Sequence, residues 1–383
     1  MTGSASGGAY DWVTEHAAQR EAAGLRRRVR PRQSDDRVLD LAGNDYLGLC
    51  GHPDVLAAAA RALKEWGAGA TGSRLVTGST ALHADLETAA ADLLGTDSAL
   101  AFSSGYLANI GAVTALTGPG CLIVSDAGNH ASLIDACRLS RARVAVTPHR
   151  DVAAVERALA ERRETRAVVL TDGVFSVDGD VAPLAELAAV ARRHGAGLIV
   201  DEAHAIGVIG PAGRGSVHAA GLAGAPDVVV TGVLSKSLGS QGGLVAGPRG
   251  VVEHVVDTAR SFIFDTGLAP AAAGAALGAV ELLRANPSLP AAVRARARDL
   301  YGIARSLGLD AIEPAAAVCG IRIGRPEVAV ACATACLETG VRVGCFRPPS
   351  VPAGRSCLRL TARADLTEAD LTLAAAVLGE VLR

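Results

Sequence analysis

Aromatic side chains and methionine are scarce in this sequence of 383 residues. Phe, Trp and Tyr together make up 3% of it, and there is a single Met. Hydrophobic residues still account for 50% of the chain, so a large core must be filled mainly by Ala, Val and Leu. The length allows roughly two domains of ordinary size.

An excess of one charge is also absent. The formal net charge is −2, and the 37 basic and 39 acidic residues are mixed along the chain. Because the sequence has no basic stripe and no acidic tail, we expect no nucleic acid partner.

The cysteines do not form a recognisable metal or redox pattern. There are eight of them, with no Cys-X-X-Cys pair and none at zinc-ligand spacing from a histidine. We therefore expect no metal site, and free, mostly buried thiols in a reducing cytoplasm. The eight are Cys50, Cys121, Cys137, Cys319, Cys332, Cys336, Cys345 and Cys357.

Residues 98–125 contain no charged side chain, which raises the question of a membrane-spanning helix. Such a helix needs ~20 mostly apolar residues. Here Gly118, Pro119 and Gly120 interrupt the run, so we expect a strand, a helix, a turn and a second strand in a buried core. Residues 1–16 lack the basic and apolar segments of a signal peptide. We therefore expect a cytoplasmic protein with no membrane segment.

The middle of the chain alternates between strand and helix patterns. This alternation predicts an α/β fold with a mainly parallel sheet covered by helices on both faces. Ligands bind at the carboxyl ends of the strands in such sheets. The strands are expected at 98–104, 121–126, 142–149, 166–176, 196–204 and 227–236, and the helices at 105–116, 130–140, 151–163 and 183–195. The polar residues near the expected strand ends are Ser103, Ser104, Asp126, His130, Ser176, Asp201, His204 and Lys236.

The last hundred residues have a different pattern. Strand-like segments such as "GIRIGRP" and "SCLRLTARADL" alternate with two helical segments, which predicts a smaller α+β domain. We therefore expect an N-terminal arm at 1–45, a large domain at 46–284 and a small C-terminal domain at 285–383.

Lys236 occupies an unusual place for a lysine. It follows the apolar run "DVVV" at 227–230, inside the small and flexible stretch "TGVLSKSLGSQGG". A lysine in a partly desolvated pocket has a pKa below the ~10.4 of a free side chain, and its neutral amine can form a Schiff base. The stretch alone does not distinguish this role from a solvated loop lysine or a phosphate clamp.

Other residues favour a Schiff base with pyridoxal 5'-phosphate (PLP), which needs a carboxylate for its ring nitrogen and amide donors for its phosphate. Asp201 in "LIVDEAH" supplies a carboxylate at a strand end, and His204 follows three residues later. His130 in "DAGNHASL" could stack on the ring. Gly105 opens a helix after a strand, where backbone amides bind phosphate well. Each signal is weak alone, but their joint order with Lys236 last is much more specific.

The chain resembles the α-oxoamine synthases, which are PLP enzymes of fold type I that condense an amino acid with an acyl thioester and release carbon dioxide. The resemblance covers nearly the whole chain. It is carried by "LDLAGNDYLGL", "GAGATGSRLVTGSTALHADLE", "FSSGYLAN", "SDAGNHASLIDA", "VFSVDGD", "VDEAHAIGVIG", "LSKSLGSQGG" and "FRPPSVPAGRSCLRLT". Within the family, "RPPSVPAG" is most similar to biotin-pathway members, which join L-alanine to a pimeloyl thioester carried by coenzyme A or acyl carrier protein.

The resemblance implies a role for each matching residue around the cofactor. Lys236 matches the Schiff-base lysine, which also moves the α-proton, and Asp201 matches the partner of the ring nitrogen. His204 matches the partner of the phenolic oxygen, and His130 matches the stacking histidine. The remaining matches to cofactor-binding positions are Ser176, Ser104, Gly105, Tyr106 and, from a partner chain of a homodimer, Thr266.

The resemblance also implies substrate contacts. Arg359 in "LRLT" matches the arginine that pairs with the carboxylate of the amino acid, and Asn44 in "NDYLG" matches a second contact. Arg26 in "GLRRRVR" matches an arginine that meets the acyl substrate, although a solvated basic run explains it equally well. Ser73 stands where glycine-specific relatives carry Thr, so we expect a preference for L-alanine.

Two positions depart from the family pattern. Val233 occupies the place of a threonine whose hydroxyl reaches the phosphate, so that contact must come from Thr231, Ser235 or Ser237 or be missing. Ala205 replaces the usual glycine after His204.

Three alternatives remain open. The first is a relative that uses glycine, such as a glycine C-acetyltransferase. The second is a nicotinamide-binding protein, against which the missing Gly-X-Gly-X-X-Gly motif counts. The third is a silent scaffold subunit, against which the presence of Lys236 counts.

Overall fold

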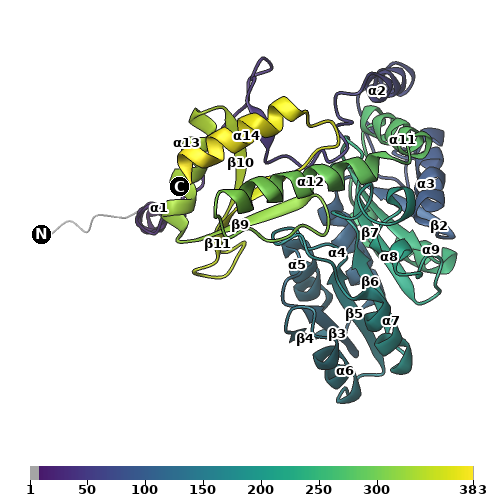
Figure 1. Ribbon diagram of the computed structural model, residues 1–383. Helices are drawn as coiled ribbons and strands as arrows, with labels where there is room; N and C mark the ends of the chain where they lie inside the picture. The colour runs from purple at the N-terminus through teal and green to yellow at the C-terminus, as the bar shows by residue number, and fades with distance from the viewer. Residues whose placement is uncertain (1–7, 383) are drawn as a thin grey trace, which may run out of the picture.

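A seven-stranded sheet forms the centre of the molecule in the computed structural model, which describes residues 8–382 (Figure 1). Its strand order is β2-β8-β7-β6-β5-β3-β4. Strand β8 runs antiparallel to both of its neighbours, and the other neighbouring pairs are parallel. The strands are β2 Ser98–Phe102, β3 Cys121–Asp126, β4 Arg143–Thr147, β5 Arg166–Asp172, β6 Gly197–Asp201, β7 Val228–Val233 and β8 Gly243–Gly247. The mainly parallel α/β fold expected from the alternating sequence is confirmed.

The buried residues explain why both faces of this sheet are covered. Leu198 and Val200 of β6 pack into one hydrophobic core, and Ile199 between them packs into another. Successive side chains of a strand point to opposite faces, so a strand covered on both faces is apolar throughout. The helices of this region are α3 Ala81–Leu94, α4 Gly105–Leu116, α5 Ala131–Ser140, α6 Val152–Ala160, α7 Leu184–Arg193, α8 Ser216–Ala219, α9 Arg249–Thr258 and α10 Arg260–Ile263, with the short 3₁₀ helix η1 Pro211–Gly213.

Helix and strand ends follow local chemistry. The side chain of Asp151 accepts a hydrogen bond from the Ala154 amide and caps α6, close to where the sequence predicts this helix to begin. Strands β5 and β6 end at Asp172 and Asp201, earlier than the sequence predicted, because the chain turns at these carboxylates.

A second sheet of four strands lies beside the first. Its order is β1-β10-β11-β9, with β1 Leu39–Leu41, β9 Val318–Gly324, β10 Val341–Phe346 and β11 Ser356–Thr361. Figure 1 shows α12 crossing the middle of the molecule, between the large sheet and the C-terminal helix α14. The remaining helices are α1 Asp11–Ala22, α2 Pro53–Trp66, α11 Pro270–Ala285, α12 Leu289–Ser306, α13 Pro326–Glu338 and α14 Glu368–Val381.

The proposed boundary at residue 285 falls between α11 and α12. Strand β1, from the expected N-terminal arm, pairs in parallel with β10 of the small sheet. We keep the division into an arm at 1–45, a large domain at 46–284 and a small domain at 285–383 as a proposal. The first seven residues of the arm lie outside the described part of the chain.

The structure also bears on the expected free cysteines and on the question of a membrane-spanning helix. All eight cysteines are free, and five of them are buried. Among residues 8–382, no helix has the length and the apolar character needed to cross a membrane.

Candidate active site

Lys236 lies in the turn between β7 and β8, at the carboxyl end of the large sheet. Its Nζ atom is 3.0 Å from Nε2 of His204. Burial lowers the pKa of Lys236 to about 8, although the nearby carboxylates of Asp201 and Asp172 act in the opposite direction. A solvated loop lysine would not show this shift, so the side chain is placed to supply a neutral amine.

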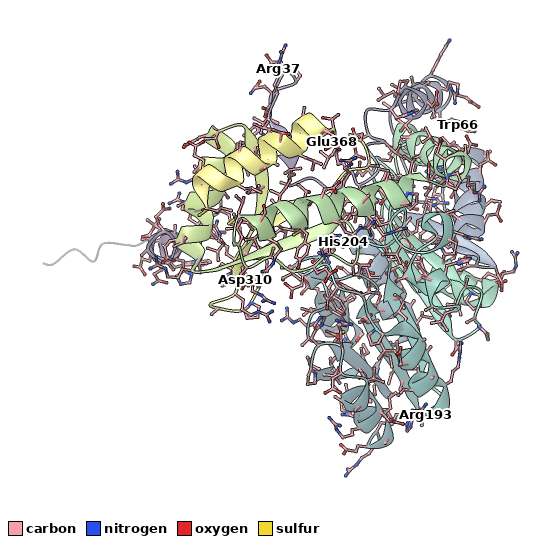
Figure 2. All side chains as sticks on the ribbon, viewed as in Figure 1. Arg37, Trp66, Arg193, His204, Asp310 and Glu368 are labelled. Carbon is pink, nitrogen blue, oxygen red and sulfur yellow. The ribbon has the colours of Figure 1, made fainter. Side chains whose placement is uncertain are left out.

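His204 connects the lysine to a residue that the sequence did not single out. Its Nδ1 atom is 2.5 Å from the hydroxyl of Tyr46, which is fully buried. Burial, reinforced by Lys236, lowers the pKa of His204 well below its ordinary value, so the imidazole is neutral. Figure 2 shows His204 near the centre of the molecule.

Asp201 ends strand β6 and is buried. Its Oδ2 atom accepts a hydrogen bond of 2.7 Å from Nδ2 of Asn109, and its Oδ1 atom accepts one of 2.9 Å from the Ala203 amide. The Asn109 carbonyl oxygen in turn accepts a bond of 2.5 Å from the hydroxyl of Thr231. This chain of bonds fixes the carboxylate at the strand end.

His130 is the N-cap of α5, which follows β3. Its Nδ1 atom is 2.7 Å from Oγ of Ser132, so the ring is held against its own helix. Burial lowers the pKa of His130, and Lys236 acts in the same direction. The structure thus brings His130, Asp201, His204 and Lys236 to one edge of the sheet.

Asp172 is a functional candidate that the sequence analysis missed. It ends β5, is 3% exposed, and accepts a hydrogen bond of 3.3 Å from the His130 amide. Burial raises its pKa well above the ordinary value, and the neighbouring Asp201 reinforces that effect. The same signal that identified Asp201, a carboxylate after an apolar strand, could have identified Asp172.

The residues expected to form the phosphate loop lie at the N-terminus of α4. Ser104 caps this helix by accepting a hydrogen bond of 3.2 Å from the Leu107 amide. A Cβ atom on Gly105 would lie 2.1 Å from Cγ1 of Val233, so only glycine fits there. Tyr106 is 43% exposed, and its hydroxyl donates to Asp135 over 2.5 Å.

The unusual Val233 therefore packs directly on the start of this helix. Of the three hydroxyls considered as substitutes for the missing threonine, Thr231 donates to Asn109 and Ser237 donates to the carbonyl of Ile206. Ser235 is exposed. Of the three, only Ser235 has a hydroxyl without a hydrogen-bond partner among the described residues.

Arg359 on β11 is 4% exposed. Its two terminal nitrogens donate to the carbonyl of Ser176 over 2.8 Å and to Oδ1 of Asn44 over 2.9 Å. Its guanidinium also lies 4.5 Å from the ring centre of Phe346. Within residues 8–382 no carboxylate pairs with Arg359, and its buried Nε atom has no hydrogen-bond partner. This arginine is therefore free to bind a substrate carboxylate.

Ser176 contributes its carbonyl oxygen to that arrangement, and no described residue bonds to its hydroxyl. Ser73 and Thr266 form an isolated antiparallel bridge, and Thr266 is exposed. Arg26 is exposed as well and pairs with Glu21 over 3.3 Å. No hydrogen bond or ion pair in the described part of the chain joins Arg26 to the residues around Lys236.

These residues fit PLP on structural grounds. The amine of Lys236 has a lowered pKa, Asp201 presents a fixed buried carboxylate, and α4 begins at Gly105 after a strand, where backbone amides suit an anion. The buried Nε of Arg359 has no hydrogen-bond partner among the described residues, which fits the expected contact with an amino-acid carboxylate.

Comparisons with known proteins agree with this geometry. The family model for class I and II aminotransferases matches residues 36–378. An 8-amino-7-oxononanoate synthase from Mycobacterium sp. (strain JLS) is 62% identical over 371 residues, which cover 97% of this chain and 96% of that relative. The serine palmitoyltransferase of Sphingomonas wittichii superposes with a TM-score of 0.91 at 30% identity, covering 98% of this chain and 97% of the other.

A second solved structure contains the cofactor. It is a serine palmitoyltransferase variant from S. paucimobilis with a bound PLP–myriocin aldimine, and it matches with a TM-score of 0.89 at 31% identity over 97% of this chain and 98% of the other. The chain therefore belongs to the class I and II aminotransferase family of PLP-dependent enzymes, in the α-oxoamine synthase branch that includes the 8-amino-7-oxononanoate synthases.

Proposed function

We propose that this PLP-dependent acyltransferase condenses L-alanine with a pimeloyl thioester to give 8-amino-7-oxononanoate, carbon dioxide and the free thiol carrier, a step of biotin biosynthesis. The observation that carries the proposal is the 62% identity to an 8-amino-7-oxononanoate synthase across nearly the full length of both chains. The buried Arg359, which has no carboxylate partner among the described residues, supports an amino acid as one substrate.

Each side chain of the candidate site has a distinct role in the proposed reaction. PLP, when bound, withdraws electrons from the α-carbon of the amino acid. Nζ of Lys236 holds the cofactor and then moves the α-proton, for which its lowered pKa suits it. Asp201 keeps the ring nitrogen protonated, and His204 donates to the phenolic oxygen. Arg359 orients the amino acid by its carboxylate.

His130 has the remaining role. It would stack on the ring of the bound cofactor and polarise the thioester carbonyl. Its position supports this role, because Ser132 and the backbone contact with Asp172 hold it beside the lysine turn. Ser104, Gly105 and Tyr106 would hold the phosphate of the cofactor, and Ser176 would contact its phenolic oxygen.

The acyl carrier enters, in our proposal, at an arginine-lined pocket of about 440 Å³ between the N-terminal arm and α13. Val330, Ala333 and Leu337 contribute apolar side chains to this pocket, and Glu21 and Glu327 are its only acidic residues among those described. Coenzyme A and acyl carrier protein both present phosphate on a pantetheine arm, which suits such a pocket. Its arginines are Arg26, Arg27, Arg28, Arg30, Arg342 and Arg347.

We also propose that two copies of the chain form the working enzyme. Leu75, Val76 and Phe264 are 54%, 79% and 70% exposed, and they flank the bridge between Ser73 and Thr266. Such an exposed apolar group favours an interface. In the dimer, Thr266 reaches the cofactor phosphate of the partner subunit. We place this enzyme in the cytoplasm, as the free thiols suggest.

The test is a direct assay of purified protein with L-alanine and pimeloyl-CoA, with product identified by mass. The same protein is offered glycine with acetyl-CoA, which a glycine C-acetyltransferase would use. A matched Lys236→Arg variant, which keeps the charge but cannot supply a neutral amine, controls for background. Product from glycine and acetyl-CoA alone would contradict the proposal, and so would product from the variant at the parent rate.

A further inference from the structure

His149 lies outside the site described above, in the turn after β4, yet both of its ring nitrogens face carboxylates. Nδ1 is 2.9 Å from Oδ1 of Asp126, and Nε2 is 2.8 Å from Oδ2 of Asp180. The ring also meets the ring of Phe175 edge-on, with centres 4.3 Å apart. The side chain is partly buried, with 37% of its surface exposed.

Two carboxylates require two donors. A neutral imidazole has a single N–H group, whereas an imidazolium has two. The charged groups that face His149 are Asp126, Asp180 and Arg150, and Arg150 also donates to Asp180 over 3.2 Å. Burial opposes the charged form, but the two carboxylates outweigh it and raise the pKa of His149 to about 9.

Each carboxylate belongs to a loop that enters the active site. Asp126 ends β3 and accepts hydrogen bonds from the amides of Gly128 and Arg150, so it shapes the turn that leads to His130. Asp180 closes the loop of residues 173–180, because its carbonyl accepts a bond of 3.0 Å from the Phe175 amide.

The second loop carries the contact to the substrate arginine. Its Ser176 carbonyl accepts the hydrogen bond from Arg359. At its other end, Gly179 packs against Val318 of β9, where a Cβ atom would lie 2.6 Å from the Val318 carbonyl oxygen. The loop is closed on itself by a backbone hydrogen bond between Phe175 and Asp180 and by a bridge between Val174 and Val181, so it can be held or displaced as one unit between the large and the small sheet.

We propose that the His149 imidazolium is a positioning group for amino-acid binding. It ties the loop of residues 173–180 to the turn that carries His130, so that the Ser176 carbonyl keeps Arg359 turned towards the substrate carboxylate. This inference rests on the proposed function for the role of Arg359, but the tie between the two loops does not depend on it.

The pH dependence has a definite sign. The folded pKa is raised, so the imidazolium and both of its bonds are fully present below the ordinary pKa of ~6.5 and are lost as the pH rises through about 9. A His149→Gln variant lacks the charge at every pH. The difference between parent and variant must therefore be large near neutrality and must vanish at high pH.

The experiment titrates the PLP absorbance of the holoenzyme with L-alanine for the parent, His149→Gln and a matched control, His194→Gln. His194 ends α7, and its ring is 3.9 Å from a single carboxylate, on Glu156. We expect His149→Gln to weaken L-alanine binding about tenfold near neutral pH, the worth of one charge-assisted hydrogen bond, with kcat changed much less. The ratio of the two Kd values falls towards one at about pH 10, because the parent has then lost its proton as well.

A ratio that stays constant with pH would mean that His149 acts only by packing, and a ratio near one at neutrality would remove the role altogether. Hydrogen exchange of the 173–182 backbone without amino acid gives an independent reading. We expect faster exchange there in His149→Gln and no change in His194→Gln, and unchanged exchange in His149→Gln would overturn the tie. If the parent itself does not bind L-alanine, the proposed function fails. The hydrogen-exchange result still tests whether His149 links the two loops.

Discussion

Nζ of Lys236 and Nε2 of His204 lie 3.0 Å apart, and the opposite nitrogen of that imidazole meets the buried hydroxyl of Tyr46. A neutral histidine thus separates the lysine from the rest of the core. Because the imidazole carries no charge, the lysine ammonium gains little from it, and burial lowers the pKa of the lysine to about 8. The protonation state of this amine should therefore control its reaction with PLP.

Cofactor uptake should follow the protonation of Lys236. Only the neutral amine reacts with an aldehyde, so the rate of PLP uptake by cofactor-free protein should rise with pH through about 8 and level off above it. The chain has only two lysines, and Lys64 is exposed. Borohydride followed by peptide mass analysis should label Lys236, and Lys64→Arg should take up PLP like the parent. Uptake that does not change with pH, or label on Lys64, would refute the assignment.

Replacement by asparagine should affect Asp201 and Asp172 differently. Asp201→Asn keeps some PLP but loses about 100-fold or more in turnover, because a neutral amide cannot hold the ring nitrogen protonated. Asp172→Asn should cost much less activity, because burial raises the pKa of this carboxyl well above its ordinary value and so already disfavours its charged form. Steady-state kcat and the cofactor absorbance of both variants test this. The electron-withdrawal argument fails if Asp201→Asn stays within a few-fold of the parent.

Ser73 should bias the choice of amino acid. It is partly buried and bridged to Thr266, and a threonine there would add one methyl group. A buried methyl discriminates by about 1–3 kcal/mol, roughly 10–200-fold. We expect Ser73→Thr to shift kcat/KM from L-alanine towards glycine without loss of PLP. Ser73→Ala is the control that removes the hydroxyl and adds no bulk. An unchanged ratio in the threonine variant would leave Ser73 a structural residue.

A charge in the exposed apolar group should separate the subunits. Val76 is 79% exposed, so Val76→Asp costs little in the isolated chain but places a carboxylate in the proposed interface. Sedimentation should show a dimer for the parent and a monomer for the variant, with loss of the phosphate contact from Thr266. Val29→Asp, at a residue that is 94% exposed on the N-terminal arm, serves as the matched control. An active monomeric parent would rule out a shared site.

The sequence predicted the large sheet well because its signals are local. Apolar runs such as "CLIVSD" and "RAVVLTD" end in polar residues, and the structure has strands there that end at Asp126 and Asp172. Strand β8 was missed because "GLVAG" at 243–247 is rich in glycine, a poor strand former. This strand is stabilised by its two neighbours and not by its own propensity.

Part of the candidate site could also be predicted from local sequence signals, and part could not. The residues after strands, such as Asp201 and Lys236, could be found because strand ends converge at one edge of a parallel sheet. Tyr46 could not, because it meets His204 from 158 positions away in the sequence. The Asn109 and Thr231 bonds that fix Asp201 also join separate elements, and no sequence pattern gives their geometry.

The pairing of β1 with β10 has a consequence for how the protein is made. Leu39 pairs with Val341, so most of the chain separates the two partners, and β11 lies between β10 and β9. A ribosome releases the whole large sheet, with Lys236 and Asp201, before β10 and β11 exist. Strand β1 therefore remains unpaired until β10 has been synthesised. Such long-range pairing forms late in folding. The strands that lead to Asp201 and Lys236 are therefore complete in a nascent chain well before Arg359 on β11 has been synthesised.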